Sequence, residues 1–320
     1  MSELPPYPQP APPGPEGQPT PAPYAGPWVQ PQPSPWGSLT AYPEDPLISP
    51  DYSGWWRRGV SLAKLAWRQI LVLQAIVGVL TFTVQTVAAT WQSFALRDID
   101  RATAAGQDPD LGSIVAGTGL VLVASLVVAL VGMVATLAAV RIVVEAATGG
   151  QPDLGAALGG AVRRLFPLLG WGILSGLLVV VGLCACLVPG LYFVAVLLVL
   201  APVVALERGN AIGRCFKLFH GDLGASVART ATILGMVVGV SVVGGIITGI
   251  ASLAAPPETA STGAFVASAA VSSGFGVVIG GALRILIDPL TVAAYADMRA
   301  RIEPLSTGML VQELGIRGAA

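Results

Sequence analysis

The sequence predicts an all-α membrane protein with six transmembrane helices, arranged as three hairpins with cytoplasmic amphipathic helices, and a disordered Pro-rich N-terminal tail. Two observations carry this prediction. Of the 320 residues, 54% are hydrophobic and only 11% are charged, a composition typical of membrane proteins. The few charges also leave five long charge-free runs, which are residues 69–96, 111–140, 165–206, 230–257 and 259–283.

Each charge-free run is long enough to cross a bilayer. A helix rises about 1.5 Å per residue and the hydrocarbon core is about 30 Å thick, so about 20 apolar residues span it. Helices are expected because the bilayer core holds no water to satisfy exposed backbone amides. The run at 165–206 crosses twice, with a tight external turn at Pro189 and Gly190. The predicted spans are 69–92, 114–140, 165–187, 190–206, 230–253 and 266–296.

Residues 1–50 differ in composition from the predicted membrane domain, residues 51–315, and from the short C-terminal end, 316–320. They hold 17 of the 26 prolines of the chain. Such a segment cannot bury enough apolar surface to offset the entropy of ordering it, and its prolines favour extended polyproline II. We expect a disordered cytoplasmic tail. It serves either as a spacer or as a ligand for a protein partner with an aromatic groove that reads stretches such as residues 10–13.

The distribution of Lys and Arg predicts the orientation. Fourteen of them lie before the first span, between spans two and three, between four and five, and after span six. The opposite loops hold only Arg97 and Arg101, beside four aspartates. Because Lys and Arg near span ends resist translocation, we expect both termini in the cytoplasm.

Two cytoplasmic segments, 157–165 and 211–219, match in the order of aliphatic, glycine, basic and apolar positions, and residues 60–68 repeat the pattern more loosely. Each is predicted to be a short amphipathic helix on the cytoplasmic face that precedes an odd-numbered span. Such helices bury an apolar face at the headgroup boundary and offer cations to anionic lipid. We expect four cations to contact headgroups of the lipid bilayer: Arg163, Arg164, Arg214 and Lys217.

Two arginines stand four residues before a carboxylate, Arg141 before Glu145 and Arg284 before Asp288. Residues four apart are neighbours on a helix, so each pair can neutralise itself. The second pair lies within the membrane if its helix begins deep outside, and at the interface if the helix starts late. A charge inside the membrane marks either a buried interhelical pair or a transport or signalling site.

Glycines stand four apart in the pairs 172 and 176, 235 and 239, 245 and 249, and 276 and 280. Small residues at this spacing let two helix backbones approach closely. We expect them to pack helices within the bundle, with self-association of the chain as the alternative.

The residue inventory excludes several classes of site. One histidine, His220, and three cysteines provide neither a zinc site nor a disulfide framework. We therefore expect no cofactor and no metal. A formal net charge of −1 argues against a nucleic-acid partner.

Several motifs resemble a known family. They are Val-Pro-Gly-Leu-Tyr at 188–192, Ala-Pro-Val-Val-Ala-Leu-Glu at 201–207, Asn-Ala-Ile-Gly-Arg-Cys-Phe-Lys-Leu-Phe-His-Gly at 210–221 and Tyr-Ala-Asp-Met-Arg-Ala-Arg at 295–301. Over residues 50–315 the chain resembles the membrane domain associated with glycerophosphodiester phosphodiesterases, and the stand-alone actinobacterial integral membrane proteins similar to it. The resemblance implies a bacterial plasma membrane. The chain departs from the family at 215–219, where Cys-Phe-Lys-Leu-Phe replaces the usual Ser-Trp-Arg-Leu-Thr.

The family name suggests catalysis, but phosphodiester hydrolysis of that kind needs histidine acid–base chemistry and a carboxylate cluster for a divalent metal. We therefore expect that the chain is not an enzyme. The expected function is scaffolding, regulating or sensing at the cytoplasmic face of the plasma membrane. The alternative is a small transporter or lipid-handling protein with a polar site near Arg284 and Asp288, which a polar cavity there would favour.

Overall fold

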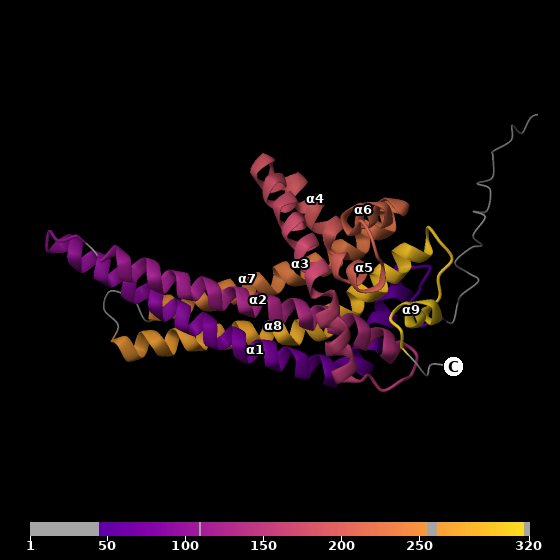
Figure 1. Ribbon diagram of the computed structural model, residues 1–320, viewed down its shortest axis with the longest axis horizontal. Coiled ribbons are helices and arrows are strands. Elements are labelled where there is room, and N and C mark those ends of the chain that lie inside the picture. Colours follow the sequence, from indigo (N-terminus) through magenta and orange to yellow (C-terminus); the bar gives the residue numbers. More distant parts are fainter. Residues whose placement is uncertain (1–44, 109, 255–260, 317–320) are drawn as a thin grey trace, which may run out of the picture. The chain divides into compact units, whose positions relative to one another are not determined.

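The structure, a computed structural model, describes residues 45–108, 110–254 and 261–316, and these residues form helices without any strand. The helices are α1 Tyr52–Ala104, α2 Leu111–Ala147, α3 Leu154–Ala185, α4 Leu187–Leu197, α5 Leu200–Leu206, α6 Ala211–Gly221, α7 Leu223–Ala254, α8 Thr262–Ala300 and α9 Thr307–Glu313 (Figure 1). The all-helical prediction is confirmed for this part of the chain.

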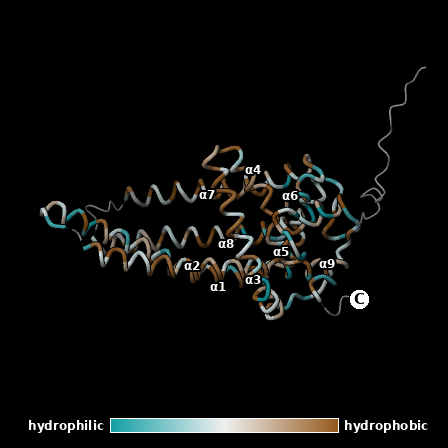
Figure 2. Tube along the Cα trace, turned by 45° about the horizontal axis from the view of Figure 1, so that its top comes forward, coloured by the Kyte–Doolittle hydropathy of each residue, from teal (hydrophilic) through white to brown (hydrophobic). Residues whose placement is uncertain are grey.

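Within the described residues, six stretches are long and apolar enough to cross a membrane: Tyr52–Ala104, Leu111–Ala147, Leu154–Ala185, Leu187–Leu206, Leu223–Ile250 and Val266–Ala300. The fourth combines α4 and α5, which are separated by Leu198 and Val199. Most residues of these stretches are not buried against the rest of the protein. Figure 2 shows hydrophobic residues along the long helices and hydrophilic residues gathered at their two ends. Six apolar helices, as predicted, thus indicate a multi-pass membrane protein.

Two of the three predicted amphipathic helices are not separate helices. Residues 60–68 belong to α1, which begins after Asp51, whose carboxylate accepts from the Gly54 amide at 3.1 Å. Residues 157–165 belong to α3, which begins after the corresponding cap, Asp153. Neither segment is followed by a capping residue that would end a helix. Pro167 falls inside α3, where it removes one hydrogen bond without stopping the helix.

The third predicted amphipathic segment is a separate helix, α6. Gly209 has φ +112°, a conformation that side-chain-bearing residues rarely adopt, and it turns the chain after α5. Asn210 then caps α6 through a 2.9 Å hydrogen bond from the Gly213 amide to its side-chain oxygen. Asp222, in an extended conformation, ends the helix.

The turn between α3 and α4 lies at Cys186, not at Pro189 as predicted. Cys186 is extended, with φ −176° and ψ 158°, and separates the two helices. Pro189 occupies the first turn of α4, where its missing N–H has no helical acceptor to lose. The proline therefore helps to start a helix.

Helices that follow one another in sequence pack together as α1 with α2, α3 with α4 and α7 with α8, and α1 also packs along α8. Contacts between α1 and α8 set their register, since Gly59 packs against Leu290 and Gly78 against Val277. The two helices are therefore antiparallel. In Figure 1 the pair α3 and α4 diverges from the other long helices.

The paired glycines do not mark close helix contacts within the chain, contrary to prediction. Only Gly172 faces a neighbouring side chain, Met133, whereas open space surrounds the other seven, which are Gly176, Gly235, Gly239, Gly245, Gly249, Gly276 and Gly280. In α7 and α8 these positions lie in the part of the helices that is little buried.

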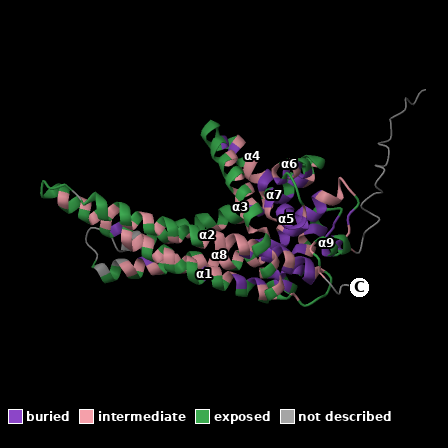
Figure 3. Ribbon diagram, viewed as in Figure 1, coloured by how far each residue is buried: buried purple, intermediate pink, exposed green. Residues whose placement is uncertain are grey.

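Burial is concentrated at one end of the long helices, which Figure 3 shows in purple. We call this end the base; it comprises residues 45–78, 135–147 and 287–316 with α5, α6 and the start of α7, up to Ile233. In the opposite distal half, made of 79–104, 111–134, 234–254 and 262–286, the described side chains include two buried ones, Ser93 and Ala269.

The predicted tail extends to residue 50, but the structure packs its last residues into the base. Leu47 and Ile48 are fully buried. The physical reason is that burying these two apolar side chains in the base is favourable. The prediction missed this because it was based on the proline-rich composition of the whole segment. Residues 1–44 lie outside the described part of the chain, so the prediction of disorder there stays a prediction.

Candidate functional site

An ion pair is fully buried in the base. Arg229 of α7 and Asp297 of α8 lie 2.8 Å apart, Nη2 to Oδ2, and their side chains are 2% and 0% exposed. The Arg229 guanidinium lies 5.9 Å from the centre of the Trp55 ring. Asp297 also accepts the amide of Ser49 at 2.5 Å. One carboxylate thus joins α7, α8 and the segment that precedes α1.

A second group of charges joins α5, α6, α8 and α9. Glu207 lies 2.5 Å from Nε of Arg214 and accepts the Tyr295 hydroxyl at 2.7 Å. Arg214 also pairs with Glu303 at 2.6 Å. Arg299 donates to that same hydroxyl at 3.0 Å. Two arginines and one hydroxyl group, from distant parts of the sequence, are therefore held around Glu207.

Arg299 extends this group to α9. It pairs with Glu303, and its two terminal nitrogens donate one hydrogen bond each, both of 2.7 Å, to the carboxylate of Glu313. Two parallel bonds from one guanidinium fix orientation as well as distance. Burial raises the pKa of Glu303, but the hydrogen bond from Arg299 and the charge of Arg214 lower it more, so its pKa is below the ordinary value.

The segment leading into α1 is fixed to the base through Asp45. Its carboxylate accepts the amides of Leu47 and Ile48 at 2.9 and 3.0 Å. It also accepts the amide and hydroxyl of Thr307 at 2.9 and 2.6 Å. The point where residues 1–44 join the described chain is therefore tied to the start of α9.

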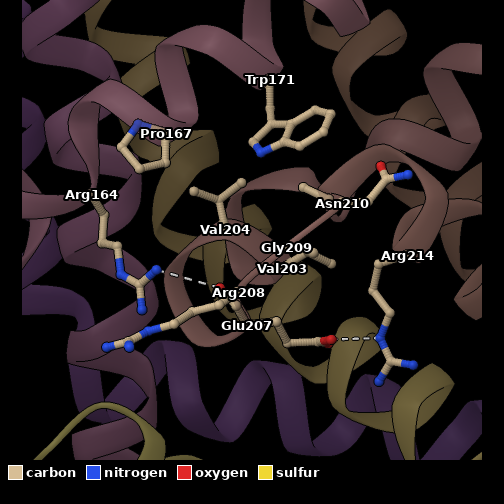
Figure 4. Close-up of a pocket in the computed structure, with 11 residues that line it drawn as sticks. Arg164, Pro167, Trp171, Val203, Val204, Glu207, Arg208, Gly209, Asn210 and Arg214 are labelled. Carbon is tan, nitrogen blue, oxygen red and sulfur yellow. Dashed lines mark hydrogen bonds and ion pairs between the residues drawn. The ribbon is translucent and has the colours of Figure 1, made fainter.

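Two pockets open in the base beside α3. One, of about 240 Å³, is lined by Arg164, Pro167, Trp171, Val203, Val204, Glu207, Arg208, Gly209, Asn210, Ala211 and Arg214 (Figure 4). The other, of about 340 Å³, is lined by Leu137, Arg141, Ala157, Gly160, Ala161, Arg163, Arg164, Ala205, Arg208, Gln312, Glu313, Leu314 and Gly315. Arg164 and Arg208 line both pockets, and Figure 4 shows both side chains at the first of them.

Local sequence explains these positions. Arg164, Pro167 and Trp171 recur at i, i+3 and i+7 on α3 and so share one face, the face that lines the first pocket. Arg208 lies between α5 and the turn that Gly209 makes. The pocket therefore forms where one helical face meets one constrained loop.

The structure forms both predicted charge pairs. Arg141 Nε lies 2.7 Å from Glu145 Oε1, and the second oxygen of Glu145 accepts the amide of Asp153 at 3.1 Å. Glu145 is buried, at 7% exposure. This pair therefore ties the end of α2 to the start of α3.

Arg284 and Asp288 lie 3.2 Å apart, Nη1 to Oδ1, with the arginine side chain 49% exposed and the aspartate 7% exposed. The register of α1 against α8 places them between the levels of Gly59 and Gly78, on the part of α1 that carries Lys64 and Arg68. The pair is thus level with cations of α1, although Arg284 stands near the middle of the apolar stretch Val266–Ala300.

A groove of about 310 Å³ runs between α1 and α8 beside this pair. Four polar side chains line it together with glycine and valine: Gln74, Thr81, Gln85 and Arg284. The sequence raises the possibility of a polar cavity at this place, and the structure shows a groove that is lined by polar side chains of α1 and by Arg284 of α8.

The four cations predicted to contact headgroups lie in different surroundings. Arg163 and Lys217 are exposed, and Arg164 is half-buried between the two pockets. Arg214 is instead held inside the protein by Glu207 and Glu303. The apolar face of α6 is directed inward too, since Leu218 and Phe219 are buried. Helix α6 therefore packs on protein, where the sequence predicts lipid.

The described residues hold no group of three or more His, Cys, Asp and Glu side chains that could bind a metal. Cys215 is fully buried, and burial raises the pKa of its thiol to about 12. A thiol with such a pKa is inert. His220 is exposed and lies 3.2 Å from the Tyr192 hydroxyl, Nε2 to oxygen.

Sequence reasoning missed the ion pairs between helices. Arg229 reads as one more loop cation, although it is buried against Asp297. A signal existed in the spacing of Tyr295 and Arg299, which stand four residues apart and therefore share a face of α8. Nothing in the local sequence connects that face to Glu207, 88 residues earlier.

No family model, no curated protein and no solved structure matches this chain.

Proposed function

We propose that the chain is a non-catalytic protein of the bacterial plasma membrane, with both termini in the cytoplasm, that scaffolds, regulates or senses at the cytoplasmic face. The observation that carries the proposal is the attachment of residues 45–49 to the base. Asp45 binds Thr307, and Ile48 is buried beside it. A tail that leaves from a fixed point can present a partner at a constant position.

The orientation proposal rests on charge. Arg57, Lys64 and Arg68 lie on the part of α1 that belongs to the base, and the connection at the distal end carries Asp98 and Asp108. Positive charge is retained on the cytoplasmic side. The base then faces the cytoplasm, and the Arg284–Asp288 pair lies near that interface.

The proposed membrane arrangement is three hairpins, α1–α2, α3 with α4 and α5, and α7–α8. In this arrangement α6 lies along the cytoplasmic face with Lys217 outward. The exposed glycines of α7 and α8 leave room for self-association.

The family resemblance supports the same reading. Glu207, Arg214, Tyr295 and Arg299 come from three of the motifs that carry it, and they meet in one network. We propose that the chain is related to that membrane domain and to the actinobacterial integral membrane proteins similar to it.

Crosslinking and pull-down from native membranes test the scaffold function. The full chain is compared with a chain lacking residues 1–44 and with Asp45→Ala, which keeps the tail but removes its attachment. We expect a stoichiometric protein partner that disappears with the tail and is recovered less well with Asp45→Ala. Recovery of the same proteins from all three chains contradicts a role for the tail.

A second function, lipid handling, is favoured by the groove between α1 and α8. Its polar side chains could contact a lipid headgroup that moves along the groove between the two helices. The test is exchange of fluorescent phosphatidylglycerol between leaflets of vesicles that contain the protein, with Gln74→Leu and Gln85→Leu as groove variants. Exchange that these variants slow supports the second function, and exchange equal to that of empty vesicles rules it out.

A further inference from the structure

Three arginines that line the two pockets, two on α3 and one after α5, have no carboxylate partner among the described residues, whereas the other charged side chains of the pockets are paired. Arg163 and Arg208 make no ion pair within the described residues. Among the same residues, the hydrogen bond of Arg164 is to the backbone oxygen of Glu207 at 3.5 Å, which is long for a hydrogen bond. Three arginines that line these pockets are thus without a carboxylate partner in the described part of the chain.

The carboxylates that line the same pockets are held by other residues. Glu207 is engaged by Arg214 and Tyr295, and Glu313 by Arg299 through two bonds. The fourth arginine of the second pocket, Arg141, is paired with Glu145. The unbalanced charge of the two pockets is therefore that of Arg163, Arg164 and Arg208.

We propose that these two pockets form one binding site for a phosphate group, held by Arg164 and Arg208 between the pockets and by Arg163 at the edge of the second. Guanidinium groups match the geometry of phosphate oxygens and bind them through paired hydrogen bonds. Bringing like charges together is unfavourable, and a bound dianion relieves that repulsion. Volumes of about 240 and 340 Å³ suit a headgroup or a small phosphorylated molecule.

The phosphate can belong to a lipid or to a soluble molecule, and the surroundings allow both. Trp171, Pro167 and Val203 give the first pocket an apolar wall. Next to it on α3, Phe166 and Ile173 are exposed, at 79% and 67%, so acyl chains of a bound lipid would lie along that helix. A soluble phosphate would use the arginines alone.

This site deepens the proposed function, because it names the chemical group that a sensor at the cytoplasmic face would bind. Only the location of the site on the cytoplasmic side of the membrane rests on the proposed function. Binding in detergent does not depend on orientation or on a tail partner. Failure of the site is therefore distinguishable from failure of the scaffold function.

The test is calorimetric titration of the full chain in an uncharged detergent with three probes: dioctanoyl phosphatidic acid, inorganic phosphate and dioctanoylglycerol. The variants are Arg164→Gln with Arg208→Gln, and Arg163→Gln alone. The control is Lys217→Gln, an exposed cation of α6 that lines neither pocket.

Loss of charged hydrogen bonds should weaken phosphatidic acid binding by about tenfold or more in the double variant. The control should match the parent chain, and dioctanoylglycerol should not bind.

The probes separate the two sources. Binding of phosphatidic acid but not of inorganic phosphate assigns the site to a lipid headgroup, and binding of both, with the same dependence on the arginines, assigns it to a free phosphate group. The proposal is overturned if neither phosphate probe binds at millimolar concentration, or if the control weakens binding as much as the pocket variants. If the double variant does not fold, Arg163→Gln decides, because its exposed side chain can be removed without disturbing the base.

Discussion

The base and the distal half of the same helices are packed in different ways. In the base, α1, α7 and α8 bury large side chains such as Trp55, Ile233 and Leu290, together with the charged pair Arg229 and Asp297. In the distal half the helices continue, but their apolar side chains face outward, as Leu120 does at 71% exposure. The difference shows that the two regions have different solvents. Lipid accommodates an apolar surface without protein contacts, whereas a charge that is buried away from water, as Arg229 is, needs a partner within the protein.

The largest expected effect comes from the buried ion pair. Asp297→Ala leaves Arg229 buried without its counter-charge and should lower the free energy of unfolding by about 3–5 kcal/mol. Equilibrium denaturation in detergent micelles measures this. Gln85→Ala, at an exposed position of the distal half, should change the free energy by less than about 0.5 kcal/mol. Replacing both charges with Arg229→Met and Asp297→Leu should recover much of the loss, and equal losses in the single and double variants would contradict the account.

Two leucines compare the regions directly. Leu290 is fully buried against Gly59, so Leu290→Ala should cost about 2–5 kcal/mol in the same assay. Leu120→Ala removes the same atoms from an exposed surface and should cost less than about 0.5 kcal/mol. Equal costs would show that the distal half is packed against protein after all.

The same substitution at two glycines should have opposite signs. Gly209→Ala forces a side chain into φ +112° and should destabilise the base by about 1–3 kcal/mol. Gly119 lies inside α2 with open space around it, so Gly119→Ala should raise the free energy of unfolding by up to about 1 kcal/mol. Thermal denaturation in detergent is sufficient to compare the two variants. A stabilising Gly209→Ala would mean that the loop relaxes without cost.

The smallest effect is on pH dependence. The pKa of Glu303 in the folded protein lies below its ordinary value of 4.5, so the folded state releases this proton more readily than the unfolded state. Its contribution is present above pH 4.5 and is lost as the pH falls through the folded pKa. In Glu303→Gln that part of the acid sensitivity should vanish, by no more than about 1 kcal/mol. Denaturation curves between pH 3 and 7 measure it, and identical pH profiles of the two chains would refute the assignment.

The positions of the apolar helices were predictable because the bilayer imposes a rule on each segment separately. The run at 111–140 requires no knowledge of any partner to be recognised as a span, and it lies within α2. The pairs Arg141–Glu145 and Arg284–Asp288 were predictable because each pair also depends on one segment alone. A spacing of four residues places both side chains on the same face of a helix.

Contacts between segments far apart in the chain were not predictable from periodicity. Glu207 meets Tyr295 and Arg214 meets Glu303 only because α5, α6 and α8 converge. The inward apolar face of α6 has the same origin, because an amphipathic pattern does not tell whether its apolar side lies on lipid or on protein.

The amino-acid sequence alone therefore determined where the apolar stretches lie along the chain, because a bilayer requires about 20 consecutive apolar residues in each span. Which arginines find carboxylates, and which three are left facing a pocket, depended on how the helices meet. Charge pairing is decided by distance in space, and helix packing brings together residues such as Arg229 and Asp297 that the chain separates.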